Sequence, residues 1–212
     1  MGLKISRPLY YYPHYYYIYL RCLLEYYIPF ANKNDLHEVY PDIYVGNIST
    51  AYNKDKLKEH DITHVISAVS GMSHIYPGEF EYMIVDVLDI KKQNMLPVFD
   101  DTSDFIDKAL TKKGKVYVHC MCGVSRSVTI VCAYLANKYK VKPLDALKMI
   151  KGIRSVANPN PSFLQQLQNY YLQLNKDGKD EEIEKIIEEM ESVQHKLQLD
   201  INNTNNITND TN

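Results

Sequence analysis

A cysteine and an arginine lie at the two ends of a five-residue turn in the middle of the 212-residue chain. With one flanking residue on each side, the segment reads His-Cys-Met-Cys-Gly-Val-Ser-Arg-Ser from His119 to Ser127. An apolar run (116–118) precedes it, and a helix-like run (128–139) follows it. A loop between a strand and a helix N-terminus directs several backbone N–H groups at one point, and the helix dipole adds to that positive field. The pattern therefore predicts a phosphate site containing a thiol that ionises.

Two side chains of this segment suit phosphoryl transfer. The thiolate of Cys120 can attack phosphorus and form a cysteinyl-phosphate, which splits hydrolysis into two steps. The planar guanidinium of Arg126 can hold two phosphate oxygens at once, a geometry that lysine lacks. The alternative is a tight strand-to-helix turn with an incidental cysteine, which Gly123 alone would suit. The complete set of residues is far more specific than a lone glycine turn and favours catalysis.

The segment resembles the active-site loop of the dual-specificity protein phosphatases, a small atypical branch of the cysteine-dependent protein tyrosine phosphatase superfamily. The resemblance covers about Asp35 to Leu174. It implies a general acid about thirty residues before the cysteine, where the chain offers Asp86 and Asp89. We favour Asp89, because it falls beyond the apolar run, in a loop that can approach a substrate. Ile90 departs from the family, which often has a polar residue soon after this aspartate.

The resemblance assigns further roles around the loop. The hydroxyl of Ser127 is expected to assist the departure of the cysteine sulfur, and His119 is expected to be buried and to orient the loop by hydrogen bonding. Asn160 is interpreted as a structural helix cap, and Cys132, within an apolar helical run, as a core residue. The phosphate is expected to lie against the loop residues Met121, Cys122, Gly123, Val124 and Ser125.

The loop interior carries no lysine or arginine before Arg126. Phosphoinositide phosphatases of this superfamily typically place basic residues there, so a phosphoprotein substrate carrying phosphotyrosine, phosphoserine or phosphothreonine is favoured. A lipid or nucleotide phosphatase remains the alternative enzyme. A phosphate-binding scaffold without turnover is the alternative from another class.

The apolar pattern predicts an α/β protein with a central, mostly parallel sheet flanked by helices, which agrees with the protein tyrosine phosphatase-like fold that the resemblance implies. Strands are expected at 43–45, 64–68, 82–87 and 116–119. One helix is expected from a cap at Ser49 or Thr50 to Glu59, and another from Leu96 until Gly114 stops it. Three more are expected after the loop, over 127–139, 143–153 and 161–174; the last two begin at prolines, as first helical positions often do.

The chain divides into three regions. A tyrosine-rich extension (1–34) precedes a catalytic domain (35–175), and the tail (176–212) is acidic, partly helical and then rich in Asn and Thr. The extension is too interrupted by polar residues for a membrane span; it could pack on the domain, lie at a membrane surface or be poorly ordered. The four cysteines show no disulfide or zinc spacing, and neither a metal nor an organic cofactor is expected.

The first residues, Met-Gly-Leu-Lys-Ile-Ser, match the N-myristoylation pattern at Gly2. One myristoyl chain binds membranes only marginally, so a second contact would be needed. The free thiols predict a reducing compartment, the cytoplasm, and the Gly2 pattern adds the expectation of membrane association. Phosphorylated proteins are the expected partners, nucleic acid is not expected, and a monomer is predicted.

Overall fold

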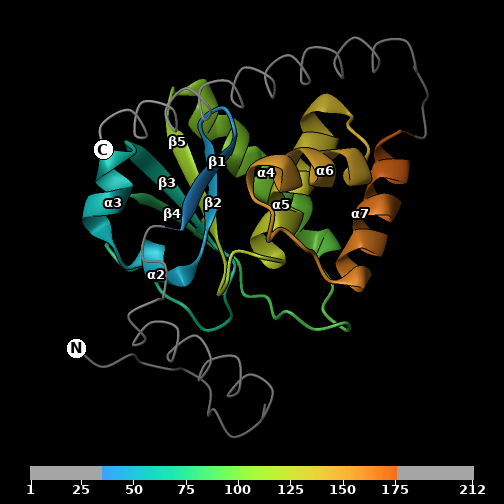
Figure 1. Cartoon of the computed structure of the whole chain (residues 1–212), viewed down its shortest axis with the longest axis horizontal. Coiled ribbons are helices and arrows are strands. Elements are labelled where there is room, and N and C mark those ends of the chain that lie inside the picture. The colour runs from blue at the N-terminus through green and yellow to red at the C-terminus, as the bar shows by residue number, and fades with distance from the viewer. Residues whose placement is uncertain (1–34, 176–212) are drawn as a thin grey trace, which may run out of the picture.

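A single five-stranded sheet forms the centre of the domain in the computed structural model, which describes residues 35–175. The strand order is β1-β2-β5-β3-β4 (Figure 1). The bounds are β1 (Leu36–Tyr40), β2 (Ile43–Gly46), β3 (Ile62–Ser67), β4 (Glu81–Ile84) and β5 (Lys115–His119). β2, β5, β3 and β4 run parallel, as expected, and β1 pairs antiparallel with β2 at one edge.

The edge strand β1 was not predicted. A two-residue turn joins it to β2, and Asp42 in that turn has a φ of 60°. The side chain of Glu38 accepts a hydrogen bond from the Asp42 backbone N–H at 2.9 Å. Only one residue of β1, Val39, is buried, so the strand lacks the apolar run that marks the inner strands β2, β5 and β3.

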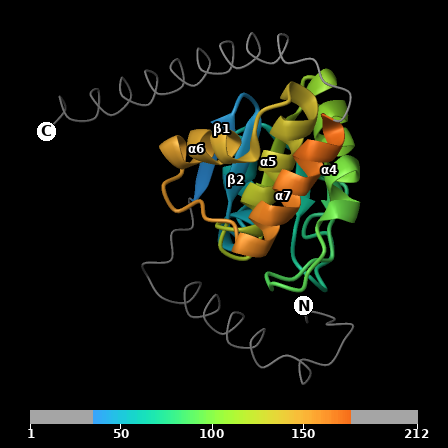
Figure 2. The same ribbon diagram turned by 90° about the vertical axis from the view of Figure 1, so that its right-hand side faces the viewer.

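Helices cover both faces of the sheet. The helices α4 (Leu96–Thr111), α5 (Arg126–Tyr139), α6 (Pro143–Ile153) and α7 (Pro161–Leu174) gather on one side, where Figure 2 shows them in front of the strands. The short helices α2 (Ile48–Ala51) and α3 (Lys54–Glu59) lie on the other side (Figure 1). Among residues 35–175, no helix has both the length and the apolar character that crossing a membrane requires.

The single helix predicted from Ser49 or Thr50 to Glu59 is wrong, because two short helices occupy that segment. Their N-caps are Asn47, whose side chain accepts from the backbone N–H of Thr50, and Asn53, whose side chain accepts from that of Lys56. The second asparagine competes for backbone groups and begins a new helix in the middle of the segment. The helices predicted at 143–153 and 161–174 are confirmed with the same bounds.

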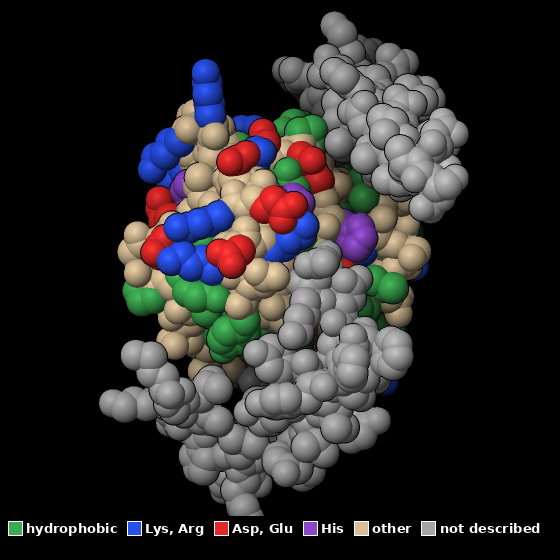
Figure 3. Space-filling model, turned by 60° about the vertical axis from the view of Figure 1, so that its left-hand side comes forward, with side chains coloured by type: hydrophobic (Ala, Val, Ile, Leu, Met, Phe, Trp, Pro, Cys, Tyr) green, Lys and Arg blue, Asp and Glu red, His purple; other side chains and the backbone are tan. Residues whose placement is uncertain are grey.

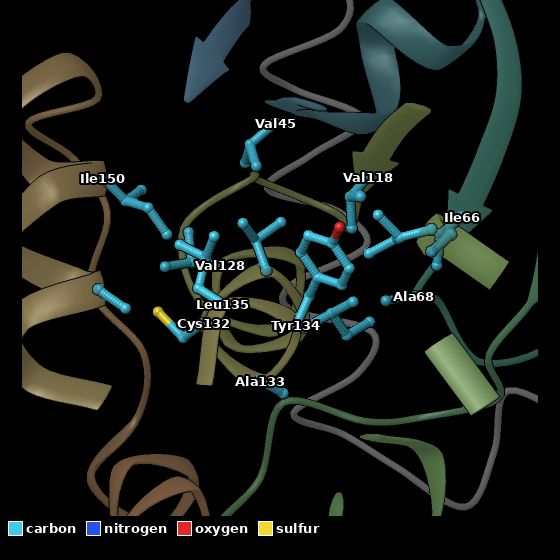
Figure 4. Packing of buried hydrophobic residues seen from close by; sticks show 14 of the residues in the cluster. Val45, Ile66, Ala68, Val118, Val128, Cys132, Ala133, Tyr134, Leu135 and Ile150 are labelled. Atoms are coloured by element: carbon cyan, nitrogen blue, oxygen red, sulfur yellow. The ribbon is translucent and has the colours of Figure 1, made fainter. Parts of the chain in front are cut away.

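Alternate residues of the central strands point to opposite faces of the sheet. Val116 and Val118 of β5 belong to the main core beneath the helices, whereas Tyr117 belongs to a second cluster with Leu57 of α3. This is the period-two pattern of a sheet that is buried on both faces. Figure 4 shows Val118 and Val45 directed at α5, which is buried nearly all round. The sheet and α5 together fix the two ends of the segment from His119 to Arg126.

The strand predicted over 82–87 ends at Ile84. The Val85 N–H still donates to the Ser67 carbonyl at 3.0 Å, and Val87 is buried, but the chain then leaves the sheet. It turns toward the carboxyl end of β5, which is the edge where open parallel sheets bind their ligands. This departure carries Asp89 toward the cysteine.

Candidate active site

The loop between β5 and α5 turns its backbone carbonyls outward. The Met121 carbonyl accepts from the Ile48 N–H at 3.1 Å, and the Val124 carbonyl accepts from the Asn158 N–H at 2.8 Å. Between them, the Cys122 and Gly123 carbonyls accept from Arg154 at 3.3 and 2.8 Å. In a planar trans peptide the N–H points opposite to the C=O. The N–H groups of the loop therefore face inward, where they form an anion-binding nest.

Gly123 permits this loop shape. Its φ of 65° is in the left-handed region, and a Cβ atom there would lie 2.5 Å from the Gly46 carbonyl oxygen and 2.7 Å from Nη2 of Arg154. Only glycine combines that backbone conformation with so close an approach.

Cys120 lies at the base of the nest and is 1% exposed. Its Sγ is 3.4 Å from Oγ of Ser127 in the first turn of α5. The hydroxyl can donate a hydrogen bond to a thiolate. A buried sulfur at a helix N-terminus with a hydroxyl beside it can both attack an electrophile and leave as a stabilised anion.

Arg126 extends from the first position of α5 toward the chain that leaves β4. It is 4% exposed, and its Nη1 donates to the Val87 carbonyl at 3.2 Å. Its Nε has no hydrogen-bond partner within residues 35–175 and lies 3.7 Å from Oδ2 of Asp89. An unsatisfied buried N–H group is costly. The guanidinium is thus prepared to bind an oxyanion.

Of the two candidate acids, the structure brings only Asp89 to the loop. Its Oδ1 accepts from Oγ of Ser125 and from Nδ2 of Asn160, both at 2.9 Å. Asp86 is exposed, and its carboxylate accepts from the Gly71 backbone N–H at 3.2 Å. The chain that leaves β4 thus places the two carboxylates in different surroundings.

Asn160 does more than the predicted capping. Its Oδ1 accepts from the Phe163 N–H at 3.0 Å, so it is the N-cap of α7. Its Nδ2 contacts Asp89, and its backbone N–H donates to Oγ of Ser125 at 3.1 Å. Sequence reasoning missed this contact because Asn160 and Asp89 are 71 residues apart. The sequence signal available for it was that a capping asparagine uses only its Oδ1, which leaves its Nδ2 free to donate to another residue.

His119 is fully buried and acts on the loop from behind. A carbonyl can only accept, so Nδ1 of His119 donates to the Cys120 carbonyl at 3.3 Å, and Nε2 accepts from the Ser67 hydroxyl at 2.8 Å. Burial lowers the pKa of His119 to about 4; the hydrogen bond to the Cys120 carbonyl opposes this shift, and the positive charge of Arg126 adds to it. The imidazole is therefore neutral near pH 7, which agrees with an orienting rather than a proton-donating group.

The other cysteines of the described region differ from Cys120. Cys132 is buried in α5, and burial raises its pKa to about 12, so it stays a protonated core thiol. Cys122 is half-buried at the edge of a small apolar cluster around Val69 and Met121. No group of His, Cys, Asp or Glu suited to a metal ion occurs within residues 35–175.

Comparison with known proteins agrees with this geometry. The family model described as "Dual specificity phosphatase, catalytic domain" matches residues 43–173. Dual specificity protein phosphatase 1B of Arabidopsis thaliana is 39% identical over 136 residues, which cover 64% of this chain and 81% of that protein. Dual specificity protein phosphatase 1 of the same plant is 42% identical over 127 residues, 60% of this chain and 64% of its own length.

Solved structures have the same fold. A mouse putative dual specificity phosphatase complexed with zinc tungstate superposes with a TM-score of 0.63 at 28% identity, covering 67% of this chain and 89% of that one. The human tyrosine phosphatase-like serine/threonine/tyrosine-interacting protein gives a TM-score of 0.60 at 32% identity over 64% of this chain and 94% of that one.

Proposed function

The chain belongs to the dual specificity phosphatases, and on that premise we propose that Cys120 is its nucleophile, Arg126 its phosphate clamp and Asp89 its general acid and base. The chain is a protein phosphatase that acts on phosphotyrosine and on phosphoserine or phosphothreonine. The main support for the proposed roles is the position of Asp89, which hydrogen-bonds to Ser125 of the loop that begins with the buried Cys120.

The first step transfers the phosphoryl group to sulfur. The Cys120 thiolate forms an S–P bond while the P–O bond to the substrate breaks, and the leaving oxygen takes a proton from Asp89. Oδ1 of Asp89 already accepts two hydrogen bonds, so the proton belongs on Oδ2. The inward N–H groups of the loop and the guanidinium of Arg126 stabilise the equatorial phosphate oxygens, where charge gathers in the transition state.

The second step returns the enzyme to its starting state. Water attacks phosphorus, and the Asp89 carboxylate accepts its proton. The S–P bond breaks and releases the Cys120 thiolate, which accepts a hydrogen bond from Ser127 at the observed 3.4 Å contact. Inorganic phosphate leaves. Neutral His119 keeps the Cys120 carbonyl turned outward throughout both steps.

The charges around the loop favour a phosphoprotein over a phosphoinositide or a nucleic acid. No lysine or arginine lies within the loop before Arg126 to meet extra phosphates. On the face that bears α3, basic and acidic side chains alternate without a patch of one sign (Figure 3). Lys58, for example, pairs with Glu79 at 2.9 Å there. A nucleic-acid surface instead gathers basic residues on one face.

The test is hydrolysis of phosphotyrosine, whose poor leaving group needs a proton, measured from about pH 5 to 8. Cys120→Ser should abolish turnover and still bind tungstate. Asp89→Asn should lower kcat by about 100-fold or more, while the matched control Asp86→Asn should behave as the wild type. If Asp86→Asn loses activity instead, the acid is misassigned. A wild type that binds tungstate without any turnover would establish the scaffold function.

We further propose a cytoplasmic protein that associates with membranes through a myristoyl group on Gly2. Gly2 and the tyrosine-rich segment lie outside the described residues, so the support is the sequence pattern alone. The tyrosine side chains suit the headgroup boundary and could provide the second contact that one acyl chain needs.

A further inference from the structure

Arg154 is the most deeply buried cation near the active site. It follows directly after α6 and is 2% exposed. Its Nε donates to the Gly123 carbonyl at 2.8 Å, and its Nη2 donates to the Cys122 carbonyl at 3.3 Å. Because each carbonyl shares a peptide plane with the next residue's N–H, these bonds aim the N–H groups of Gly123 and Val124 into the nest. One side chain thus orients two of the groups that would bind phosphate.

Asp35 balances the charge of that arginine. Its Oδ2 accepts from Nη2 of Arg154 at 2.7 Å, and its Oδ1 accepts from Nη1. This is the bidentate geometry of a strong pair. The Asp35 carbonyl accepts from the Thr50 hydroxyl at 3.3 Å, which attaches the residue before β1 to α2. Gly46 leaves room for it, since a Cβ there would lie 2.0 Å from the Asp35 carbonyl oxygen.

His37 completes the surroundings of the guanidinium. Its Nδ1 lies 2.8 Å from Nη1 of Arg154 and 3.5 Å from Oδ1 of Asp35. The pKa of His37 is lowered, mainly by burial and also by the positive charge of Arg154, although the negative charge of Asp35 acts to raise it. The imidazole is therefore neutral near pH 7, and its Nδ1 accepts from Arg154.

We propose that Asp35 and Arg154 are positioning residues for catalysis: the buried pair holds the phosphate loop in the shape that binds and turns over phosphate. The proposal rests on the proposed function of that loop. Asp35 precedes the family-model match, which begins at residue 43. The loop geometry thus depends on a residue outside the segment by which the family is recognised.

The physical reason is the cost of an unpaired buried charge. Without the Asp35 carboxylate, Arg154 would be an uncompensated cation in the interior, which is strongly unfavourable. The side chain would then turn toward solvent and release the Cys122 and Gly123 carbonyls. The peptides would rotate, and their N–H groups would no longer point into the nest. Displacements of about 1 Å in such a site can cost about 100-fold in rate.

The test compares Asp35→Asn and Arg154→Lys with Leu57→Ala. Leu57 is fully buried in the second apolar cluster, so its truncation lowers stability without touching the loop. For each protein we would measure Tm, kcat and KM with phosphotyrosine well below Tm, and the Kd of tungstate by calorimetry. Asp35→Asn and Arg154→Lys should lose about 10- to 100-fold in kcat/KM and bind tungstate more weakly. Leu57→Ala should lower Tm and keep both values. Asp35→Glu retains the charge and should recover part of the loss.

A purely structural pair gives a different result. If Asp35→Asn lowers Tm as Leu57→Ala does, yet keeps the wild-type kcat/KM and tungstate Kd, the positioning role is wrong. Should Asp35→Asn fail to fold, the same comparison is made with Asp35→Glu and Arg154→Lys, and unchanged values in both overturn the proposal. If the wild type has no turnover, the proposed function fails, but the tungstate Kd of the variants still decides whether the pair shapes the loop.

Discussion

Protonation of His119 should destabilise the protein in mild acid. Its pKa falls from 6.5 to about 4 on folding, because burial disfavours the imidazolium. The unfolded chain thus binds a proton between these values that the folded chain excludes. His119 therefore contributes no penalty above about pH 7, and the free energy of unfolding falls as the pH drops from 6.5 toward 4. At about 1.4 kcal/mol per pH unit, the loss is about 2 kcal/mol at pH 5 and about 3 kcal/mol at pH 4.

The measurement is urea unfolding of the wild type and of His119→Gln at pH 7, 6 and 5, in phosphate-free buffer because a bound anion would stabilise the folded state. The chain has no tryptophan, so circular dichroism or tyrosine emission reports unfolding. From pH 7 to pH 5 the wild type should lose about 2 kcal/mol more than His119→Gln, which corresponds to an extra shift of about 1 M in the urea midpoint. His74→Gln, which removes an exposed imidazole stacked on Tyr82, should keep the wild-type fall.

Parallel curves for the wild type and His119→Gln would refute this account. They would mean that the buried ring accepts a proton without a cost in free energy, for instance because the protonated Nε2 donates to the Ser67 oxygen instead of accepting from it. Carboxylates also titrate in acid, but they are common to both proteins, so their contributions to the free energy of unfolding cancel in the difference.

Two further predictions concern glycines. Gly123→Ala should weaken tungstate binding and lower kcat/KM by about 10-fold or more, because the new Cβ would lie 2.5 Å from the Gly46 carbonyl oxygen. Gly78 also has a positive φ, but a Cβ there would have no atom within 4 Å. Gly78→Ala is therefore the control for backbone strain alone and should keep wild-type activity. Gly2→Ala should move the full chain from the membrane fraction to the soluble fraction of expressing cells without changing phosphatase activity; equal membrane fractions for both proteins would exclude the acyl anchor.

The sequence predicted best those features that depend on local chemistry. The helices at 143–153 and 161–174 have the expected bounds because a proline marks the first position of each. The three inner strands β2, β3 and β5 were predicted from apolar runs that are buried on both faces of the sheet. The strand β1 was not predicted because its polar His37 and Glu38 interrupt the apolar run and only Val39 is buried. The split at Asn53 was not predicted because a capping asparagine looks the same as a helical one in sequence.

The contacts that shape the site could not be predicted in this way. Asn160 meets Asp89 across 71 residues, and Arg154 meets Asp35 across 119. Neither pair shares a periodic pattern or a motif spacing. Such contacts arise only when the sheet order and the helix packing bring the segments together, so the partners of Asn160 and Arg154 cannot be deduced from the sequence without the fold.

The dependence on long-range contacts explains why the active-site motif is easily recognised in the sequence and yet cannot form an anion-binding loop without the rest of the domain. The residues from His119 to Ser127 include the proposed nucleophile and phosphate clamp, but the loop's outward carbonyls accept their hydrogen bonds from Ile48, Asn158 and Arg154. These donors come from α2 and from the chain between α6 and α7. An excised loop would satisfy its carbonyls with water, and its N–H groups would not converge on one point. The free energy that would be needed to order them on binding is supplied instead by folding, so the rest of the domain makes the loop a preorganised oxyanion site.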